Sequence, residues 1–506
     1  MRRWERIDMN ILDTIITAVS PSWGLRRVAA RQALRYYQAG EVNRFSSAWL
    51  PVNTVDQENM DKTERALICA RARYLERNSD MANSAILGII RNVVNTGIRM
   101  QARTENEELN TKIEALWNEW CRPGHCDVTG QQSFYEMQRM ILRRKIVDGE
   151  ILCKLVTDRK HGLQLQLIRA DLLDNNLMMA PNSQHVIRSG IELDPYLRPI
   201  AYWVQKKDPL GYVTLEPEQV PASQMLHLWT KNHPDQIRGI SDLAVSIKRI
   251  KDTDDYLDAE TVAARIAACF SVFIVQNTPQ LPGRPGMLCK DKEDKPTEKI
   301  RPGMIMRLQP GEDVKAANPG RSATTAADFV NIHERLIGSG LGLSYEMMSR
   351  DFNKSSYSAA RQGNLEDRRT FRPIQQWMIT HFCQPVYEAF LDQAVLSGKL
   401  PEIRDYWSQP EKYRAYEWIA PGWQSIDPEK EAKADTLSMQ NGMLTLAQQC
   451  AEHGSDWRDQ LAQMAREKEY AESLGLSLNI HTSEAVQAAQ ANHTEGENTN
   501  EGSNES

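Results

Sequence analysis

The spacing of apolar and polar positions divides the chain into helical, strand-rich and again helical regions. Residues 54–94 carry apolar side chains at helical spacing in two runs, and a polar break at residues 78–80 predicts two consecutive helices. A second helical pair is predicted around residues 113–120 and 134–147. Residues 151–229 then contain the short apolar runs ILCKLVT, LQLQLI, HVIRSGIEL, PIAYWVQ and QMLHLW, separated by turn residues. These patterns predict an α+β fold with a sheet-rich body.

A projecting hairpin is predicted after the sheet-rich body. Ser241 is a suitable N-cap for a helix that runs to about residue 269, and the apolar run FSVFIVQ follows it. Residues 277–321 are rich in Pro, Gly and Lys, with nine basic and six acidic residues and short apolar runs such as GMIMRL. A helix over residues 323–337 would return to the body. The chain would therefore leave the body through one helix, form a small basic module and come back through a second helix.

Beyond the hairpin, glycine and proline mark the expected breaks. The glycines at residues 338–342 predict the end of the returning helix, and a long helix is predicted from Ser356 to about residue 396. Pro373 and Pro385 would kink this helix, and Gly398 would end it. Aromatic strands are expected around residues 406–423.

The two ends of the chain differ from the centre. Pro428 at a first helical position and Asp427 as N-cap predict helices that continue to about residue 476. Residues 1–29 predict a small amphipathic arm. Residues 483–506 contain five Glu and no Lys or Arg, a composition that cannot bury enough apolar surface to order itself.

Length and composition indicate a folded protein of several structural units. The chain has 506 residues, 41% of them hydrophobic, and a formal net charge of −6 from 61 basic and 67 acidic residues. The net charge therefore excludes a histone-like DNA binder that is basic throughout, and any nucleic-acid contact must be local. The eight cysteines form no CxxC pair and favour reduced thiols in an intracellular protein. No apolar run of membrane-spanning length occurs, so no membrane association is expected.

Positive charge gathers where the expected hairpin returns to the body. Residues 349–372 contain six Lys or Arg against three acids, a local reversal of the net charge. Within this stretch a loop between two predicted helices is small, polar and cationic. Its candidate contacts to a phosphate backbone are Ser349, Arg350, Asn353, Lys354, Ser355, Ser356 and Ser358. Lys and Ser donate hydrogen bonds without reading bases, so the predicted contact is indifferent to sequence, although an ordinary surface loop has the same composition.

Motifs for catalysis and metal binding have little support. The glycines at residues 338–342 lack the Lys of a phosphate-binding loop and follow a helix instead of a strand, so a flexible joint is favoured. The segment from Cys121 to Asp127 lacks paired metal-ligand spacing. The pair His333 and Glu334 is interpreted as a solvated or intersubunit pair. We therefore expect no catalytic residue, no metal and no cofactor.

An acid-rich stretch of the outgoing helix also has a simple interpretation. Lys248, Arg249, Lys251 and Arg265 flank its acids at spacings that include the three- and four-residue steps of helical ion pairs. A solvated or subunit-facing surface is therefore favoured over a carboxylate metal centre. The acids of this stretch are Asp252, Asp254, Asp255, Asp258 and Glu260.

Several segments together resemble the lambda-like family of phage portal proteins. The most specific is LGLSYEMMSRDFNKSSYSAAR at residues 341–361, and RARYLERNSDMANSAI, FYEMQRMILRRKIVDGE, RGISDLAVSIKRIKDTDDYLDAETVAARIAACF and IDPEKEAKA also match. The resemblance implies a portal fold: a ring, usually of twelve copies, at the unique capsid vertex of a bacteriophage or prophage. Double-stranded DNA would be packaged through this ring by a terminase and later ejected. Capsid protein and head-completion or tail adaptor proteins would be further partners, in the host cytoplasm during assembly and then in the virion.

The resemblance also implies a division of the chain and roles for its parts. Its loop over residues 344–358 would face the DNA channel, and its clip would dock partners through Arg284, Lys290, Lys292, Lys295 and Lys299. Two alternatives stay open, a DNA-processing nuclease or ATPase and a monomeric capsid adaptor. The expected units are an arm (1–29), a wing (30–239 and 359–424), a stem (240–270 and 323–343), a clip (271–322), the tunnel loop (344–358), a crown (425–482) and a tail (483–506).

Overall fold

The computed structural model describes most of the chain between residues 57 and 476, nearly all of it in the compact unit Asp61–Ser506. The expected arm and acidic tail and the five candidate clip residues lie outside the described residues. The described residues are 57–158, 161–174, 177, 179, 185–207, 213–268, 272–276, 312–316, 323–351, 356–423, 428–452 and 456–476.

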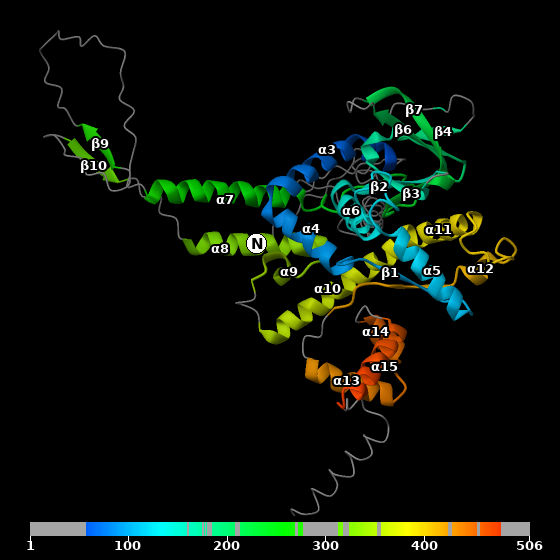
Figure 1. Ribbon diagram of the computed structural model, residues 1–506. Helices are drawn as coiled ribbons and strands as arrows, with labels where there is room; N and C mark the ends of the chain where they lie inside the picture. The colour runs from blue at the N-terminus through cyan, green and yellow to red at the C-terminus, as the bar shows by residue number, and fades with distance from the viewer. Residues whose placement is uncertain are drawn as a thin grey trace, which may run out of the picture. The chain divides into compact units, whose positions relative to one another are not determined.

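Four helices form the first part of the described chain (Figure 1). Helix α3 (Gln57–Asn78) ends at the predicted polar break, where the side chain of Ser79 caps α4 (Asp80–Val93). The second predicted pair is α5 (Glu107–Trp120) and α6 (Phe134–Asp148). A capping box starts α6: Ser133 accepts a hydrogen bond from the backbone of Glu136, whose carboxylate accepts one in return from the backbone of Ser133.

The central sheet is antiparallel and lies between two cores. Strand β2 (Glu150–Asp158) pairs with β3 (Gly162–Ile168) on one side and β8 (Met225–Trp229) on the other. Ile151 and Cys153 pack into the main helical core, whereas Leu152 packs into a second core. Because successive side chains of a strand point to opposite faces, β2 is buried on both of its faces.

A second antiparallel sheet closes over Leu152. Its strands, in sheet order, are β4 (Val186–Arg188), β5 (Ile191–Leu193), β6 (Pro199–Lys207) and β7 (Val213–Pro221). The run HVIRSGIEL is a hairpin instead of a single strand, because Ser189 and Gly190 both have positive φ and reverse the chain. Strand β7 was absent from the sequence-based expectation. It contains Pro217 and lies at the sheet edge, where a proline does not interrupt a ladder on its outer side.

Aromatic side chains fill the main core. Trp117 of α5 is 1% exposed and stacks against Trp120 at 5.0 Å, while Tyr387 and Phe390 meet its ring edge to face. Trp418 also contacts it from the short strand β11 (Tyr416–Ile419), which pairs with β1 (Arg99–Ala102). Residues far apart in the sequence therefore share one core.

The predicted hairpin is present in its described parts. Helix α7 (Ile247–Ala268) leads to β9 (Val272–Gln276), which pairs with β10 (Glu312–Ala316) before α8 (Ala323–Leu341) returns (Figure 1). The helix start at Ser241 was wrong, since α7 begins six residues later. The Ser241 hydroxyl instead donates to the Ile146 carbonyl at 3.0 Å and accepts from the Leu243 amide, which fastens a tight turn to α6. The run GMIMRL lies outside the described residues.

The long helix after the hairpin is interrupted once. Helix α10 (Tyr357–Met378) passes into one π-helical turn, Ile379–Cys383, and then into α11 (Gln384–Leu396). Ser356 caps α10, and Gly398 with φ of +72° follows the end of α11, as predicted for the two ends of the long helix. Pro373 lies inside α10, and Pro385 lies in the first turn of α11, next to the π-helical turn.

Short helices complete the described chain. Helix α12 (Pro410–Tyr413) precedes β11, and α13 (Pro428–Gln440), α14 (Leu446–Glu452) and α15 (Trp457–Ser473) follow it. Pro428 occupies the first position of α13 as predicted, whereas its expected cap Asp427 lies outside the described residues. Within the part of the chain that the structure describes, no helix is long and apolar enough to cross a membrane.

Candidate nucleic-acid interface

The returning helix enters the candidate loop through a glycine turn. The break falls within the predicted glycine segment 338–342, but α8 runs beyond its expected end at residue 337, through Gly338 and Gly340 to Leu341. The chain turns at Gly342, whose φ is +70°, and the Leu343 amide closes the turn by donating to the Gly338 carbonyl at 2.8 Å. Gly338 suits this position because a Cβ there would lie 2.8 Å from the Leu343 carbonyl oxygen.

A short helix then presents Arg350. Helix α9 (Tyr345–Ser349) is capped by Ser344 and ends at Arg350, whose φ of +55° is left-handed. The Arg350 amide donates to the Glu346 carbonyl at 2.9 Å, and its side chain is exposed. A left-handed arginine costs on the order of 1 kcal/mol, so the chain holds this residue in an unusual conformation at the point where it leaves α9.

The serines of the candidate loop mostly serve its backbone. Ser349 donates to the Tyr345 carbonyl at 2.9 Å and accepts from the Asp351 amide at 3.1 Å. Ser356 accepts from the Ala359 amide at 3.2 Å as the N-cap of α10, and Ser358 is exposed in its first turn. The structure therefore places Arg350 and Ser358 at the surface, makes Ser356 the cap of α10 and bonds the Ser349 hydroxyl to nearby backbone groups. Asn353, Lys354 and Ser355 lie outside the described residues.

The arginines of α10 are held by protein groups. Arg368 and Arg372 lie over the Trp423 ring, with guanidinium carbons 5.8 and 6.0 Å from its centroid. Arg369 pairs with the exposed Glu366 at 2.8 Å. Of the six cations counted in the sequence, four lie on α10, Arg350 follows α9, and Lys354 lies outside the described residues.

Acidic groups lie near the same mouth. The pKa of Glu334 on α8 is raised by burial and then by the charge of Asp351. His333, the neighbour of Glu334, does not act with it: its ring packs against Phe329 at 4.1 Å and lies 3.0 Å from the Thr253 hydroxyl. The pair that the sequence suggested is therefore divided between two surroundings, and His333 joins α8 to α7.

The segment from Cys121 to Asp127 is a built turn. The Asp127 carboxylate accepts hydrogen bonds from the amides of Thr129, Gln131 and Gln132, each at 3.1 Å, and from the Thr129 hydroxyl. Burial opposes ionisation, but the hydroxyl bond and then the amide bonds lower the pKa of Asp127. The Cys126 thiol lies 3.6 to 3.7 Å from three backbone carbonyls. These groups hold a loop together, which agrees with the structural interpretation of the segment.

The acids of α7 also find ordinary partners. Asp255 forms an ion pair with Lys251 one turn earlier, and Asp254 accepts a hydrogen bond from the Ser79 side chain. Asp252 and Asp258 are exposed. Among the described residues, no three His, Cys, Asp or Glu side chains are grouped so that they could hold a metal ion. The solvated interpretation of this face fits these contacts.

A buried charged cluster that the sequence did not reveal fixes the root of the hairpin. Glu150 is 2% exposed and accepts hydrogen bonds from Arg238 Nε at 2.8 Å, the His227 ring at 2.8 Å and the Gly239 amide at 3.0 Å. Arg238 also donates to the carbonyls of Ser189 and Ala170. Although burial opposes ionisation, the Arg238 charge and the His227 hydrogen bond hold the pKa of Glu150 well below its usual range.

The junction beside this cluster is tightly packed. A Cβ on Gly239 would lie 2.3 Å from the Gly149 carbonyl oxygen. A Cβ on Gly149, whose φ is +89°, would lie 2.3 Å from the Ile240 carbonyl carbon. Two glycines therefore let the chain that enters α7 cross the α6–β2 corner. This crossing fixes where the hairpin leaves the sheet-rich body.

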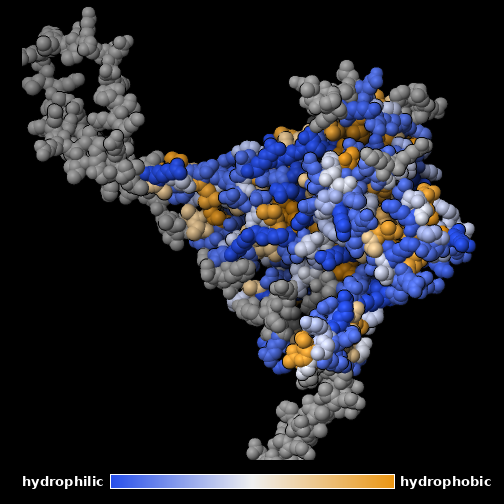
Figure 2. Space-filling view, in the orientation of Figure 1, coloured by the Kyte–Doolittle hydropathy of each residue, from blue (hydrophilic) through white to orange (hydrophobic). Residues whose placement is uncertain are grey.

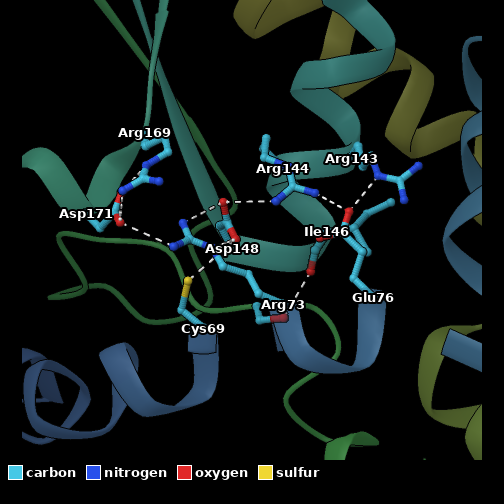
Figure 3. Close-up of polar contacts among 10 residues, drawn as sticks. Cys69, Arg73, Glu76, Arg143, Arg144, Ile146, Asp148, Arg169 and Asp171 are labelled. Atoms are coloured by element: carbon cyan, nitrogen blue, oxygen red, sulfur yellow. Dashed lines mark hydrogen bonds and ion pairs between the residues drawn. The ribbon is translucent and has the colours of Figure 1, made fainter. Parts of the chain in front are cut away.

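A second charged cluster joins α3 to α6 (Figure 3). Arg73 of α3 contacts both oxygens of Asp148, at 2.7 and 3.0 Å, and extends to Asp171 at 3.2 Å. Glu76, one turn later on α3, pairs with both Arg143 and Arg144 of α6. Figure 3 shows each carboxylate facing an arginine. Every charged side chain drawn in Figure 3 is thus paired with another protein group, and the cluster is a structural contact between the two helices.

The hairpin also carries exposed apolar residues. On the face shown in Figure 2, hydrophobic side chains gather along α7 and α8. Burial values identify the large exposed ones on these helices as Leu257, Val262, Ile332 and Leu336, each at least 40% exposed. Exposed apolar residues that form a contiguous patch are typical of a surface that contacts another protein.

Comparison with known proteins assigns the chain to a family. The family model described as phage portal protein, lambda family, matches residues 43–375. The probable portal protein of Halomonas phage phiHAP-1 is 26% identical over 416 residues, which cover 79% of this chain and 80% of that protein. Portal protein B of Escherichia phage lambda is 22% identical over 481 residues, with 85% and 88% coverage.

Two solved structures show a weaker similarity to this chain. The neck of an empty gene transfer agent (GTA) particle aligns with a TM-score of 0.43 and 13% identity, over 80% of this chain and 94% of that chain. An HK97 family portal protein from Corynebacterium diphtheriae aligns with a TM-score of 0.31 and 9% identity, over 70% of this chain and 94% of that chain.

Proposed function

Because this chain belongs to the lambda family of phage portal proteins, we propose that it forms a closed ring of identical copies, twelve in number, that conducts double-stranded DNA. It serves as the portal at the unique vertex of a phage capsid. In this role a terminase drives DNA inward through the ring during packaging, and the same DNA leaves through it at ejection. The chain itself acts as a conduit and catalyses no reaction.

The observation that carries the proposal is the extent of the family match. Residues 43–375 contain the sheet-rich body, both helices of the hairpin, the candidate loop and most of α10. The features that would build a channel are thus matched together, in one continuous segment. An isolated motif would leave an adaptor or a nuclease as open alternatives, whereas this match covers the whole arrangement from body to loop.

The hairpin surface supports contact between copies. Leu257 and Val262 on α7, and Ile332 and Leu336 on α8, expose apolar surface although they belong to an ordered helical pair. Each exposed apolar group that becomes buried contributes about 25 cal/mol for every Å² removed from water, and a ring repeats this contribution at each interface. In this proposal the stem of each copy packs against the stems of its neighbours.

The DNA contact is assigned to the loop between α9 and α10. Arg350 is exposed at the end of α9, and Lys354 lies four residues further along the chain. A few cations from each copy, repeated around a ring, attract the phosphate backbone without gripping one register of it. Such weak contacts suit a duplex that must slide, and the absence of base-reading geometry makes them independent of sequence.

Electron microscopy of the purified full-length protein tests the ring. We expect closed rings with a central channel, and we expect their mass in solution to equal twelve chains. A protein that remains monomeric in every condition that supports capsid assembly would contradict the proposal and favour the adaptor. A hydrolysis assay with DNA and ATP distinguishes the portal from a nuclease or ATPase. A portal should leave both DNA and ATP intact.

A double substitution tests the loop. We expect Arg350→Ala with Lys354→Ala to preserve rings but to lower the yield or retention of packaged genomes. The matched control is Lys399→Ala with Arg404→Ala, which removes two exposed cations near the end of α11 and should package normally. Normal packaging by the loop variant would contradict the assignment of DNA contact to residues 349–358.

Partner docking is assigned to the clip. Residues 271–322 carry the candidate cations Arg284, Lys290, Lys292, Lys295 and Lys299, which would attract acidic surfaces on terminase and later on head-completion or tail adaptor proteins. Reversal of these charges to Glu should weaken the capture of terminase by purified rings. The difference from wild-type rings should grow as the salt concentration falls. Unchanged capture would remove the clip from this role.

A further inference from the structure

One buried carboxylate holds the entrance of the candidate loop. Asp367 of α10 is 2% exposed, and its two oxygens accept from two groups of Ser344: the backbone amide at 2.7 Å and the hydroxyl at 2.6 Å. Ser344 in turn accepts from the Met347 amide at 3.3 Å as the N-cap of α9. Asp367 therefore orients the hydroxyl whose lone pair starts α9.

Asp367 is the centre of a docking face on α10. Gly363 and Thr370 lie one turn before and one turn after it, at the spacing that places three residues on one side of a helix. A Cβ on Gly363 would lie 3.4 Å from the Ser344 Cβ, and a Cβ on Gly342 would lie 3.0 Å from Thr370. This face holds the turn from α8 into α9 directly against the helix that follows the loop.

Other helices fix α9 from its remaining sides. The Ser84 hydroxyl of α4 donates to the Met348 carbonyl at 3.4 Å, and the Tyr345 hydroxyl donates to Asn331 of α8 at 3.1 Å. Met347 lies 3.4 Å from the position of a Cβ on Gly88 of α4. Helix α9 is therefore held by α4, α8 and α10 together, although it has five residues and could not persist alone.

We infer that Asp367 is a positioning residue for the DNA-contacting loop: its paired bonds to Ser344 fix the start of α9, and through α9 they fix where Arg350 enters the channel. Asp367 belongs to α10, the helix that follows the loop, so this contact ties the element before the loop to the element after it. This inference rests on the proposed function for its consequence, but the positioning itself is a statement about geometry.

The choice of aspartate follows from its acceptors. Ser344 presents two donors, an N–H and an O–H, and a carboxylate offers two acceptor oxygens at the required separation. Asparagine has nearly the same shape but only one acceptor oxygen, so one Ser344 donor would face an NH₂ group. Asp367→Asn therefore removes one hydrogen bond with little change in volume. The neighbouring Glu366→Gln neutralises an exposed carboxylate of the same helix and is the matched control.

The experiment compares full-length wild-type, Asp367→Asn and Glu366→Gln rings by cryo-electron microscopy and by packaging in infected cells. For Asp367→Asn we expect intact rings and fewer packaged particles. The fraction of subunits in which α9 is displaced should rise roughly tenfold, as the loss of about 1.4 kcal/mol would give. Glu366→Gln should match wild type in both measurements. Undisplaced loops in Asp367→Asn rings would overturn the inference.

The two measurements separate the inference from the proposed function. Displaced loops with normal packaging would uphold positioning by Asp367 and refute DNA contact by the loop. If Asp367→Asn fails to assemble, Ser344→Ala replaces it, because this variant keeps the amide bond to Asp367 and removes the hydroxyl alone. Ser344→Ala rings with loops in the wild-type position would likewise overturn the inference.

Discussion

The hydroxyl of Thr253 on α7 lies 3.0 Å from Nδ1 of His333 on α8, and the two residues are 80 positions apart in the sequence. The Thr253 hydroxyl also donates to the Arg249 carbonyl at 2.8 Å. Because a threonine hydroxyl has one hydrogen, Nδ1 of His333 must carry the proton and donate to Thr253. The bond therefore fixes the protonated nitrogen of His333 and ties α7 to α8.

This bond is one of three successive contacts between antiparallel helices. Toward the tip, the Tyr256 ring meets Phe329 with centroids 4.4 Å apart. Toward the body, Gly340 lies against Ser246, whose hydroxyl would be 2.8 Å from a Cβ on that glycine. Side chains thus set the register of the helices before the β9–β10 pairing continues the hairpin.

Removal of the central contact should loosen the stem. Thr253→Val keeps the branched shape but leaves the His333 N–H without its acceptor, at a cost of about 1 to 3 kcal/mol. We expect a lower urea midpoint and faster hydrogen exchange in α7 and α8. Asp258→Asn, on the exposed face of α7, is the control and should leave both measurements within error. Equal behaviour of the two variants would show that the Thr253 bond contributes nothing.

Gly239 should tolerate no side chain. Gly239→Ala would place its Cβ 2.3 Å from the Gly149 carbonyl oxygen, so the backbone that enters α7 must move. We expect a loss of about 3 kcal/mol or more in unfolding free energy, in the range of severe core overpacking. Gly88→Ala inside α4 is the matched control, since its Cβ would meet only the Met347 side chain, with the sulfur at 3.4 Å, and alanine favours a helix by about 1 kcal/mol. Thermal unfolding of both variants measures the contrast.

The sequence predicted those elements whose pattern reflects local burial. Four of its strand runs overlap β2, β3, β6 and β8, and Ser356 and Gly398 bound the long helix as expected. It failed where tertiary contacts override a local signal. Ser241 resembles a cap, but its hydroxyl bonds to α6, and Pro217 resembles a strand breaker, but the strand lies at an edge.

The candidate site was predictable only in part, for a related reason. Composition alone marked the cationic loop, and Arg350 is exposed as a contact residue must be. Composition could not show that the hydroxyls of Ser349 and Ser356 bond to the backbone. It also could not show that Asp367 bonds to Ser344 at the start of α9. Glu150 and Arg238 are 88 positions apart, and no spacing rule joins residues across that interval.

Cys69 should resist alkylation in the folded protein although it is not fully buried. Burial, followed by the charge of Asp148, raises the pKa of the Cys69 thiol to about 12, so almost none of it is thiolate at about pH 8. We expect iodoacetamide to modify Cys69 far more slowly in buffer than in urea, as peptide mass spectrometry would show. The fully buried Cys153 serves as the protected reference. Labelling of Cys69 at the same rate in both solutions would contradict the effect of its surroundings.

Acid should destabilise the root of the hairpin in two stages. Burial lowers the pKa of His227 below its ordinary 6.5, so its neutral form supports folding above that pH and this contribution is lost as pH falls. The pKa of Glu150 is also lowered, from an ordinary 4.5, so its contribution is present above 4.5 and is lost below it. The urea midpoint should therefore fall moderately from pH 6.5 to 4.5 and more steeply below.

Substitution separates the two stages. His227→Gln should flatten the first decline, because the residue that must gain a proton is gone while an amide can still donate to Glu150. Glu150→Gln should lower stability by about 3 to 5 kcal/mol at neutral pH, since Arg238 becomes a buried cation without its carboxylate, and should flatten the steeper decline. The exposed pair of Lys433 and Glu429 offers a control, because Glu429→Gln should change neither stage. If the urea midpoint of His227→Gln still falls between pH 6.5 and 4.5, another group must be responsible for the first stage.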